Sequence, residues 1–184
     1  GTYTKPIFFT RILDRNGKVL IENVPETRQA LKESTAFLLT DAMTDVMQSN
    51  VMYTRPGAGI NATGSSAAIP GMTTAGKSGT TSDNNDIWFV GYSPYYTAGI
   101  WGGCDNNQKL KDEHGSRNGG TSFAKRIWRK IMTRVHDGMS DPGFPMPDGI
   151  ETAQVCRKSG KLAVPGVCSS DPRGNAVYTE YFAK

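Results

Sequence analysis

The segment from Gly71 to Thr81, GMTTAGKSGTT, combines a lysine, short hydroxyl side chains and glycines at a spacing that suits two different chemistries. From Gly71 to Ser78 it reads G-x-x-x-x-G-K-S, the pattern of a loop whose backbone N–H groups surround nucleotide phosphates. From Lys77 onward it reads K-S-G-T-T, in which an ammonium group and hydroxyl groups can bind a carboxylate. The neighbouring sequence must decide between the two chemistries.

A phosphate-binding loop needs a buried strand before it and a helix that begins directly after its lysine. The residues before Gly71 are GSSAAIP, which end in proline, and those after Ser78 are GTTSDNNDIWFVGY, which lead into β-prone residues. The flanking sequence therefore disfavours a P-loop nucleotide site, which we retain as an alternative function.

The second interpretation places Lys77, Ser78 and Gly79 on a strand that leads through a short loop into a β-hairpin. The edge of such a strand can pair with an extended peptide. Gly79 has no side chain to keep an acyl group away, and Lys77 with the hydroxyls of Ser78 and Thr80 can bind a terminal carboxylate. This pattern favours a site for an extended, anionic substrate.

These residues require a sheet and helices to hold them, and the hydrophobic pattern predicts both. It predicts a hairpin of residues 7–13 and 18–22, a helix over residues 31–46, and a second hairpin of residues 87–92 and 95–104. It also predicts a helix in the segment of residues 119–135, with a start signal at Thr121 and Ser122. The last helix has one wide apolar face, formed by Phe123, Ile127, Ile131 and Val135 together with Trp128 and Met132. Residues 52–74 predict a loop with short strands, because Gly, Pro and Ser are frequent there. We expect an α+β fold with an antiparallel sheet and packing helices in residues 1–135, and a Pro/Gly-rich extension without regular structure in residues 136–184.

The composition indicates a folded domain and argues against nucleic acid as a partner. Of the 184 residues, 37% are hydrophobic and 21% are charged, which is enough apolar material for a core. The net charge is +4 with both signs interspersed, and the basic cluster AKRIWRK fits the solvated face of a helix. No apolar run is long enough to span a bilayer, so we expect any membrane anchor to lie outside this sequence.

Three cysteines leave two possibilities open. Cys156 and Cys168 bracket a loop rich in turn-forming residues, whereas Cys104 lies in a strand-like run. A disulfide that closed this loop would stabilise the fold by on the order of 3 kcal/mol, but two free thiols fit the spacing equally well. A metal site is disfavoured, because there is no C-x-x-C pair and His114 and His136 are far apart in the sequence.

The region TAGKSGTT…DIWFVGYSPYYTAGIWGGCDN closely resembles the sequence around the lysine motif of class A penicillin-binding proteins. In that family A-G-K-[ST]-G-T-T is followed by D-x-W-F-x-G-Y-[ST]-P and by a strand that ends in G-x-D-N. The corresponding segments here are Ala75 to Thr81, Asp86 to Pro94 and Gly103 to Asn106. Further stretches are also similar to the family: GTYTKPIFFTRILDRNGKVL, TRPGAG, GGTSFAKRIWRKIM and GIETAQVCRKSGKLAVPGVC…TEYF, the last resembling the C-terminal extension of Gram-positive members.

The resemblance implies the C-terminal part of a penicillin-binding or serine β-lactamase-like transpeptidase fold. It implies a peptidoglycan D,D-transpeptidase that needs no cofactor and no metal, whose substrate is the D-Ala-D-Ala end of a stem peptide and which β-lactam antibiotics acylate. It also implies a location at the extracytoplasmic face of the membrane, with an anchor N-terminal to this sequence. In that compartment the Cys156–Cys168 disulfide is favoured over free thiols.

Roles are implied for the motif residues one by one. Lys77 would support catalysis and substrate binding, and the backbone N–H of Thr80 would be one oxyanion-hole donor. The hydroxyls of Ser78 and Thr80 would bind the substrate carboxylate, Gly79 would keep the strand open, and Thr81 would complete the substrate site and support the loop. Asp86 and Trp88 are expected to be structural, as a capped turn and a core aromatic residue.

The nucleophile is expected to lie elsewhere. The family carries it in an S-x-x-K motif, followed by S-x-N and then by the lysine motif. Here Ser122 to Lys125 and Ser82 to Asn84 match these strings only in the reverse order, so we interpret both as coincidental. The remaining N-terminal part of the same domain is therefore expected as a partner, present as a second chain. A soluble serine β-lactamase-like hydrolase and a non-catalytic wall-binding module remain as alternatives.

Overall fold

The computed structural model describes residues 1–48, 52–55, 58–60, 62–106, 108–110, 122–172 and 174–184. Its elements, in chain order, are β1 (Thr2–Thr4), β2 (Arg11–Leu13), β3 (Val19–Glu22), β4 (Thr27–Gln29), α1 (Glu33–Asp45), β5 (Met52–Arg55), β6 (Ala58–Ile60), the short 3-10 helix η1 (Ser65–Ala67), β7 (Ala75–Thr80), β8 (Asp86–Tyr92), β9 (Thr97–Gly103), α2 (Phe123–Val135), β10 (Ile150–Cys156) and β11 (Val177–Ala183). No described helix has the length and apolar character needed to cross a membrane.

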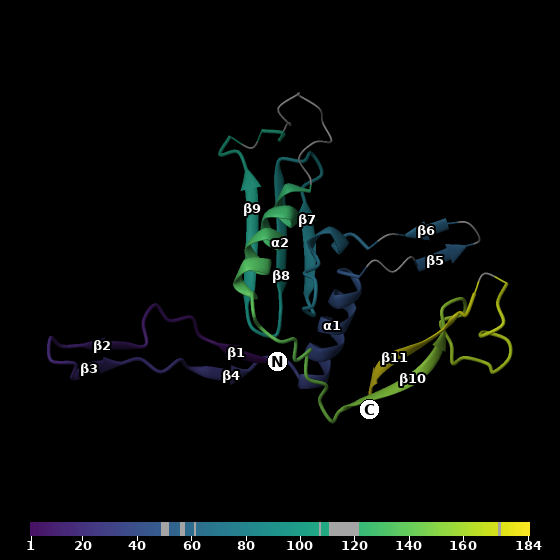
Figure 1. The fold of residues 1–184 in the computed structure, drawn as a ribbon, viewed down its shortest axis with the longest axis horizontal. Coiled ribbons are helices and arrows are strands. Elements are labelled where there is room, and N and C mark those ends of the chain that lie inside the picture. The colour runs from purple at the N-terminus through teal and green to yellow at the C-terminus, as the bar shows by residue number, and fades with distance from the viewer. Residues whose placement is uncertain (49–51, 56–57, 61, 107, 111–121, 173) are drawn as a thin grey trace.

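The core lies between the antiparallel sheet β7-β8-β9 and helix α2, which covers one face of the sheet (Figure 1). Side chains alternate along β8, so Ile87 and Phe89 point to this face and are fully buried. The ring of Phe89 meets the indole of Trp128 edge-on, with 5.3 Å between centroids, and the Trp128 indole N–H donates to the carbonyl of Ala98 at 3.0 Å. The predicted hairpin of residues 87–104 is confirmed, and it forms two of the three strands.

Helix α1 contacts β7 on one side and β11 on the other. The hydroxyls of Thr40 and Tyr92 lie 2.9 Å apart, and Tyr92 has the same parity along β8 as Trp88 and Val90. Helix α1 therefore packs on the sheet face opposite α2. It leaves Trp88, Val90 and Trp101 about half exposed on that face within the described structure.

The helix predicted in residues 119–135 is confirmed as α2, which begins at Phe123, but only part of its apolar face is covered. Ala124, Trp128 and Met132 pack on the sheet, while Ile127, Ile131 and Val135 remain exposed. The basic side chains of the helix apart from Lys125 are exposed, as expected for a solvated face; they are Arg126, Arg129, Lys130 and Arg134. Residues 119–121, which the sequence placed at the start of this helix segment, lie outside the described residues.

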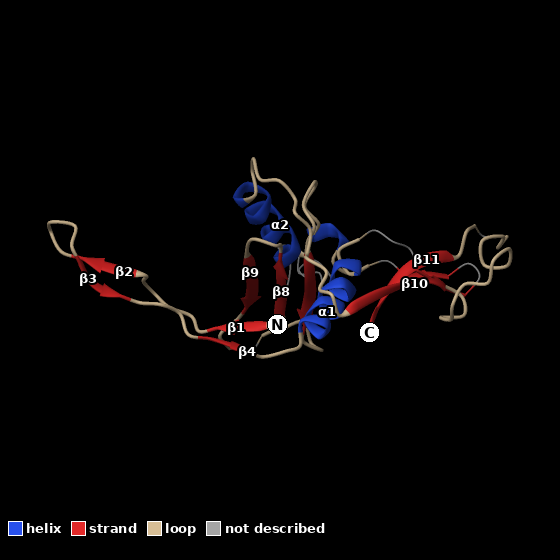
Figure 2. Cartoon of the chain, turned by 90° about the horizontal axis from the view of Figure 1, so that it is seen from below, coloured by secondary structure: helices blue, strands red, loops and turns tan. Residues whose placement is uncertain are grey.

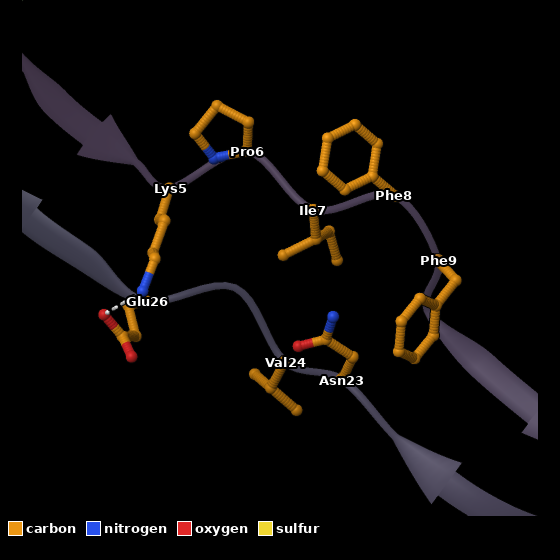
Figure 3. A pocket seen from close by; sticks show the side chains of 8 residues that line it. All are labelled: Lys5, Pro6, Ile7, Phe8, Phe9, Asn23, Val24 and Glu26. Carbon is orange, nitrogen blue, oxygen red and sulfur yellow. Dashed lines mark hydrogen bonds and ion pairs between the residues drawn. The ribbon is translucent and has the colours of Figure 1, made fainter.

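Residues 1–29 form one long arm that projects from the central sheet on the side opposite the β10-β11 hairpin, as both views show (Figures 1 and 2). Its tip is the predicted turn, in which the Asp14 carboxylate accepts the backbone N–H groups of Asn16 and Lys18, and Gly17 has φ +83°. The paired strands are shorter than predicted, because the two segments of the arm separate between the β1-β4 ladder and the β2-β3 ladder. There they enclose a hollow of about 250 Å³, in which Ile7 and Asn23 face each other while Phe8 points away (Figure 3).

The C-terminal extension has more regular structure than its composition predicts. Strands β10 and β11 pair in an unbroken antiparallel register from Ile150–Ala183 to Cys156–Val177. The prolines and glycines that suggested irregular structure lie outside these two strands. The hairpin leans on α1, where the rings of Phe37 and Tyr181 meet edge-on with 5.3 Å between centroids.

Acidic side chains gather at this contact between α1 and β11. Burial raises the pKa of Asp41, and the neighbouring carboxylates of Asp45 and Glu180 raise it further. Burial and Glu180 likewise raise the pKa of Asp45, while the Arg157 guanidinium lowers it. The Arg157 guanidinium also lies over the ring of Tyr178 at 4.5 Å, so it interacts with both this ring and the Asp45 carboxylate.

Candidate active site

The K-S-G-T segment forms β7, at the edge of the three-stranded sheet. β7 pairs with β8 from Ala75–Tyr92 to Thr80–Ile87, and no described strand pairs with its other edge. After Lys77 the chain continues as strand and turn rather than as a helix. The described geometry therefore does not support the phosphate-binding interpretation, whereas a free strand edge can accept an extended peptide.

Backbone N–H groups alternate in direction along an antiparallel strand. The N–H of Thr81, just after β7, donates to the carbonyl of Asp86 at 3.2 Å and so points toward β8. The N–H and C=O groups of Thr80 and Ser78 consequently point the other way, toward the free edge. The sequence named both residues for the site, but only the register shows which backbone groups are unpaired.

The side chain of Lys77 is exposed and bends toward this free edge. Its ammonium group donates to the carbonyl of Ser78 at 3.0 Å and lies 3.4 Å from the Ser78 hydroxyl. Lys77 and Gly79 share the sheet face of Trp88 and Val90, while Ser78 and Thr80 share the face of Ile87 and Phe89. The motif side chains thus project from both faces of the sheet, and the Lys77 ammonium approaches Ser78 at the strand edge.

Two glycines of the motif strand allow close packing against β8. A Cβ atom at Gly76 would lie 2.8 Å from Cζ of Phe89 and 3.1 Å from the carbonyl oxygen of Val90. A Cβ atom at Gly79 would lie 3.3 Å from the Cβ of Trp88, on the face of Lys77. Gly79 therefore lets Trp88 approach β7 closely.

The turn between β7 and β8 differs from its predicted form in two ways. Trp88 was expected in the core but is 47% exposed, because it has the opposite parity to the buried Ile87 and Phe89. The carboxylate of Asp86 accepts the indole N–H of Trp101 at 3.0 Å instead of capping the turn. The hydroxyl of Thr81 takes the capping role, since it accepts the backbone N–H groups of Asn85 and Asp86, both at 3.0 Å.

Of the two strings interpreted as coincidental, Ser122 to Lys125 lies at the start of α2 and Ser82 to Asn84 lies in the turn after β7. Ser122 precedes α2, and the Lys125 ammonium donates to the carbonyl of Thr63 at 2.9 Å, which ties α2 to the segment before η1. Ser82 lies exposed in the β7-β8 turn, where Asn84 adopts φ +58°. Their assignment as non-catalytic remains a prediction.

A serine–histidine pair that the sequence pattern did not reveal lies at the other end of the sheet. The Ser93 hydroxyl is 2.7 Å from Nε2 of His136, whose Nδ1 is 2.7 Å from the carbonyl of Met132. Nδ1–H therefore donates to Met132, and Nε2 accepts the Ser93 proton. Both residues are only 6% exposed, and the Ser93 oxygen also accepts the N–H groups of Tyr95 and Tyr96. The pair fastens the β8-β9 hairpin to the end of α2.

Cys156 and Cys168 are brought together in the extension, where both are buried with Ala176 in a small second core. They are free thiols in this structure. The hydrogen bond with Cys168, aided by backbone N–H groups, lowers the pKa of the Cys156 thiol to about 7. Cys104 is exposed, and His114 lies outside the described residues. Within the described chain no group of His, Cys, Asp and Glu side chains has the arrangement of a metal site.

Two family descriptions match this chain. Residues 1–133 match the family described as "Penicillin binding protein transpeptidase domain". Residues 146–184 match the one described as "Penicillin-binding protein 1A, C-terminal domain".

Curated proteins from several bacteria are similar along nearly the whole chain. The Penicillin-binding protein 1A of Clostridium tetani is 37% identical over 182 residues, which cover 99% of this chain and 21% of that protein. The Penicillin-binding protein 1A/1B of Bacillus subtilis is 32% identical over 200 residues, which cover 100% of this chain and 20% of that protein. The chain spans about a fifth of the length of the curated relatives it matches.

Solved structures have the same fold. Penicillin-Binding Protein 1A from Haemophilus influenzae matches with a TM-score of 0.71 at 18% identity, over 98% of this chain and 29% of that chain. The PonA1 protein from Mycobacterium tuberculosis, solved in complex with penicillin V, matches with a TM-score of 0.62 at 26% identity, over 90% of this chain and 40% of that chain. The predicted α+β fold is thereby confirmed.

Proposed function

Because the chain belongs to the penicillin binding protein transpeptidase family, we propose that it forms one wall of the active site of a serine D,D-transpeptidase. The observation that carries this proposal is the position of the K-S-G-T segment. It lies on an edge strand whose free side presents the backbone of Ser78 and Thr80 together with the Lys77 ammonium. An extended peptide that ends in a carboxylate is the ligand that such an edge suits.

In this proposal a peptidoglycan stem peptide pairs with the free edge of β7. The Lys77 ammonium and the hydroxyls of Ser78 and Thr80 attract the terminal carboxylate of this peptide. These groups belong to opposite faces of β7, and a carboxylate at the strand edge can contact both. The N–H of Thr80 donates to the carbonyl oxygen of the scissile amide as negative charge develops there. Positive charge beside this edge also lowers the cost of bringing an anionic substrate close to the nucleophile.

The reaction has two steps. A serine from outside this chain attacks the carbonyl carbon of the D-Ala-D-Ala amide, the C–N bond breaks, and the terminal D-Ala leaves with a proton on its amine. An amine from a neighbouring strand then attacks the ester, forms the cross-link and releases the serine. A β-lactam ring opens by the first step alone, so the same serine stays acylated.

The remaining N-terminal part of the same domain is the proposed source of the serine and its lysine partner. Uncovered apolar side chains on two surfaces support this proposal. One surface comprises Trp88, Val90 and Trp101 on the sheet face of Lys77, and the other comprises Ile127, Ile131 and Val135 on α2. The sequence predicts that this part is present as a second chain. The division of this chain into residues 1–135 and 136–184, and the extracytoplasmic location, belong to the same proposal.

The cysteines of the extension fit that location. Cys156 and Cys168 already lie together in a core of three buried residues, too small to stabilise a separate module by burial alone. In an oxidising compartment they form a disulfide that closes the loop between them.

The experiment is labelling of the full-length protein with a fluorescent penicillin. Lys77→Ala is expected to lower the second-order labelling rate by at least about 100-fold, since it removes the ammonium group that lies at the proposed edge. Lys77→Arg keeps the charge but changes the shape of the charged group, so its labelling rate should lie between those of wild type and Lys77→Ala. Labelling of Lys77→Ala at the wild-type rate, or covalent labelling at Ser122, would contradict the proposal.

A further inference from the structure

The turn that follows the motif strand is fixed by one residue. Three polar groups of Thr81 are used within this turn: its N–H donates to Asp86, its carbonyl accepts the N–H of Asn84 at 2.9 Å, and its hydroxyl accepts the N–H groups of Asn85 and Asp86. The hydroxyl of Thr81, a residue expected both to complete the substrate site and to support the loop, is therefore engaged in closing the turn.

The same turn is fastened across the sheet to β9. The Asp86 carboxylate accepts the indole N–H of Trp101 at 3.0 Å, and the Trp101 ring lies 6.2 Å from that of Trp88. Gly103 pairs with Asp86, and a Cβ atom there would lie 2.6 Å from Oδ1 of Asp86 and 2.7 Å from Cζ2 of Trp101. Only a glycine at this position leaves room for the Asp86–Trp101 contact.

We propose that Thr81, Asp86 and Trp101 are positioning residues that fix the backbone N–H of Thr80 for acyl transfer. Thr80 directly precedes Thr81, and its N–H points to the free edge where the oxyanion would form. A donor to a developing oxyanion must hold its place to within about 0.5 Å to be effective. The three residues act through the backbone, because their polar groups contact one another and the turn rather than the free edge. This inference rests on the proposed transpeptidase function.

The test compares matched substitutions in the full-length protein. Thr81→Val keeps the shape of the side chain but removes the acceptor, Thr81→Ser keeps the acceptor, and Trp101→Phe removes the indole donor but keeps an aromatic ring. Each variant is assayed with a fluorescent penicillin by stopped-flow mixing, which separates the dissociation constant of the initial complex from the acylation rate constant. Thermal melting of each variant shows whether it is folded.

Thr81→Val and Trp101→Phe are expected to lower the acylation rate constant by about 10- to 100-fold, with the dissociation constant changed by less than about threefold. Thr81→Ser should retain most of the wild-type rate. If Thr81→Val fails to fold, Trp101→Phe alone provides the test.

Two results overturn the inference. One is an acylation rate constant within about twofold of wild type in both folded variants, and the other is a loss confined to the dissociation constant. Lys77→Ala, measured beside them, separates this inference from the proposed function. If Lys77→Ala is slow while both turn variants are fast, only the positioning role fails; if Lys77→Ala is also fast, the proposed function fails with it.

Discussion

The Lys77 ammonium lies 3.0 Å from the carbonyl oxygen of Ser78, its neighbour on β7. The charge that the family motif provides is thus held at the free edge of the strand by the strand itself. In the proposed function, a substrate carboxylate at this edge would replace the neutral carbonyl as the partner of the ammonium group, and a charged acceptor makes a stronger hydrogen bond.

The Ser78 hydroxyl, 3.4 Å from the same ammonium, is expected to contribute to carboxylate binding. In the full-length protein, Ser78→Ala should slow acylation by penicillin by about 10- to 100-fold, the effect of one hydrogen bond to a charged group. Ser78→Thr keeps the hydroxyl and is the matched control. Equal labelling rates for Ser78→Ala and wild type would show that this hydroxyl does not contact the ligand.

Gly76 is expected to tolerate no side chain. Gly76→Ala places a Cβ atom 2.8 Å from Phe89 and should lower the free energy of unfolding by about 1–3 kcal/mol, because neither Phe89 nor the β8 backbone can move away within the core. Gly99→Ala is the control, since its Cβ would lie 3.6 Å from Val90, an ordinary contact. Melting temperatures of the two variants measure the difference, and similar values would contradict this account.

The buried Ser93–His136 pair is expected to matter for stability alone. Ser93→Ala leaves His136 and the N–H groups of Tyr95 and Tyr96 without their partner, which should cost about 1–3 kcal/mol of unfolding free energy. Ser82→Ala, at an exposed turn position, should cost far less. Among folded molecules, penicillin labelling should be unchanged by Ser93→Ala; a specific loss of acylation would instead place the pair in the active site.

The acidic contact between α1 and β11 predicts a pH dependence of stability. The pKa of Asp41 is raised in the folded state above its ordinary value of 3.8, so the folded state binds more protons and stability falls as pH rises through that region. Asp41→Asn removes the cost of holding a charged carboxylate at this contact at pH 7. The free energy of unfolding should rise by less than about 1 kcal/mol, since solvent screens the site, and the melting temperature should rise with it.

The gain from Asp41→Asn should shrink as pH is lowered toward 3.8, because the wild-type carboxyl then becomes neutral as well. Asp137→Asn, at an exposed position after α2, is the control. A gain that is independent of pH would show that the charge of Asp41 is not its cause.

Cys156 and Cys168 are expected to form a disulfide when the protein is exposed to oxidised glutathione. The two thiols lose two protons and two electrons, and the glutathione disulfide is reduced to two thiols. Closing the loop should stabilise the extension by on the order of 3 kcal/mol. Non-reducing peptide mapping identifies the bond, with Cys156→Ser as control; two free thiols after oxidation would refute it.

The sequence alone was sufficient for the motif strand, the hairpin that follows it and the C-terminal helix. Each has a local signal: β-prone aromatic runs on either side of Ser93-Pro94, and an apolar spacing over residues 123–135. The choice between phosphate and peptide chemistry also came from local flanks, since a helix after Lys77 was excluded by the glycine and threonines that follow it. Such signals depend on neighbours in the chain, which is why they can be read without a structure.

The tertiary structure decided what depends on partners distant in the sequence. Strands β10 and β11 pair across a long Pro/Gly-rich loop, so composition concealed them. The exposure of Trp88 follows from which face of β8 packs on α2. Thr81 was expected to support the loop, but only the structure identifies the N–H groups of Asn85 and Asp86 as the partners of its hydroxyl. The direction of the Thr80 N–H likewise follows from pairing with β8. The alternation of side chains along a strand fixes which residues share a face of the sheet. Only tertiary packing determines which face is covered and which strand edge is free.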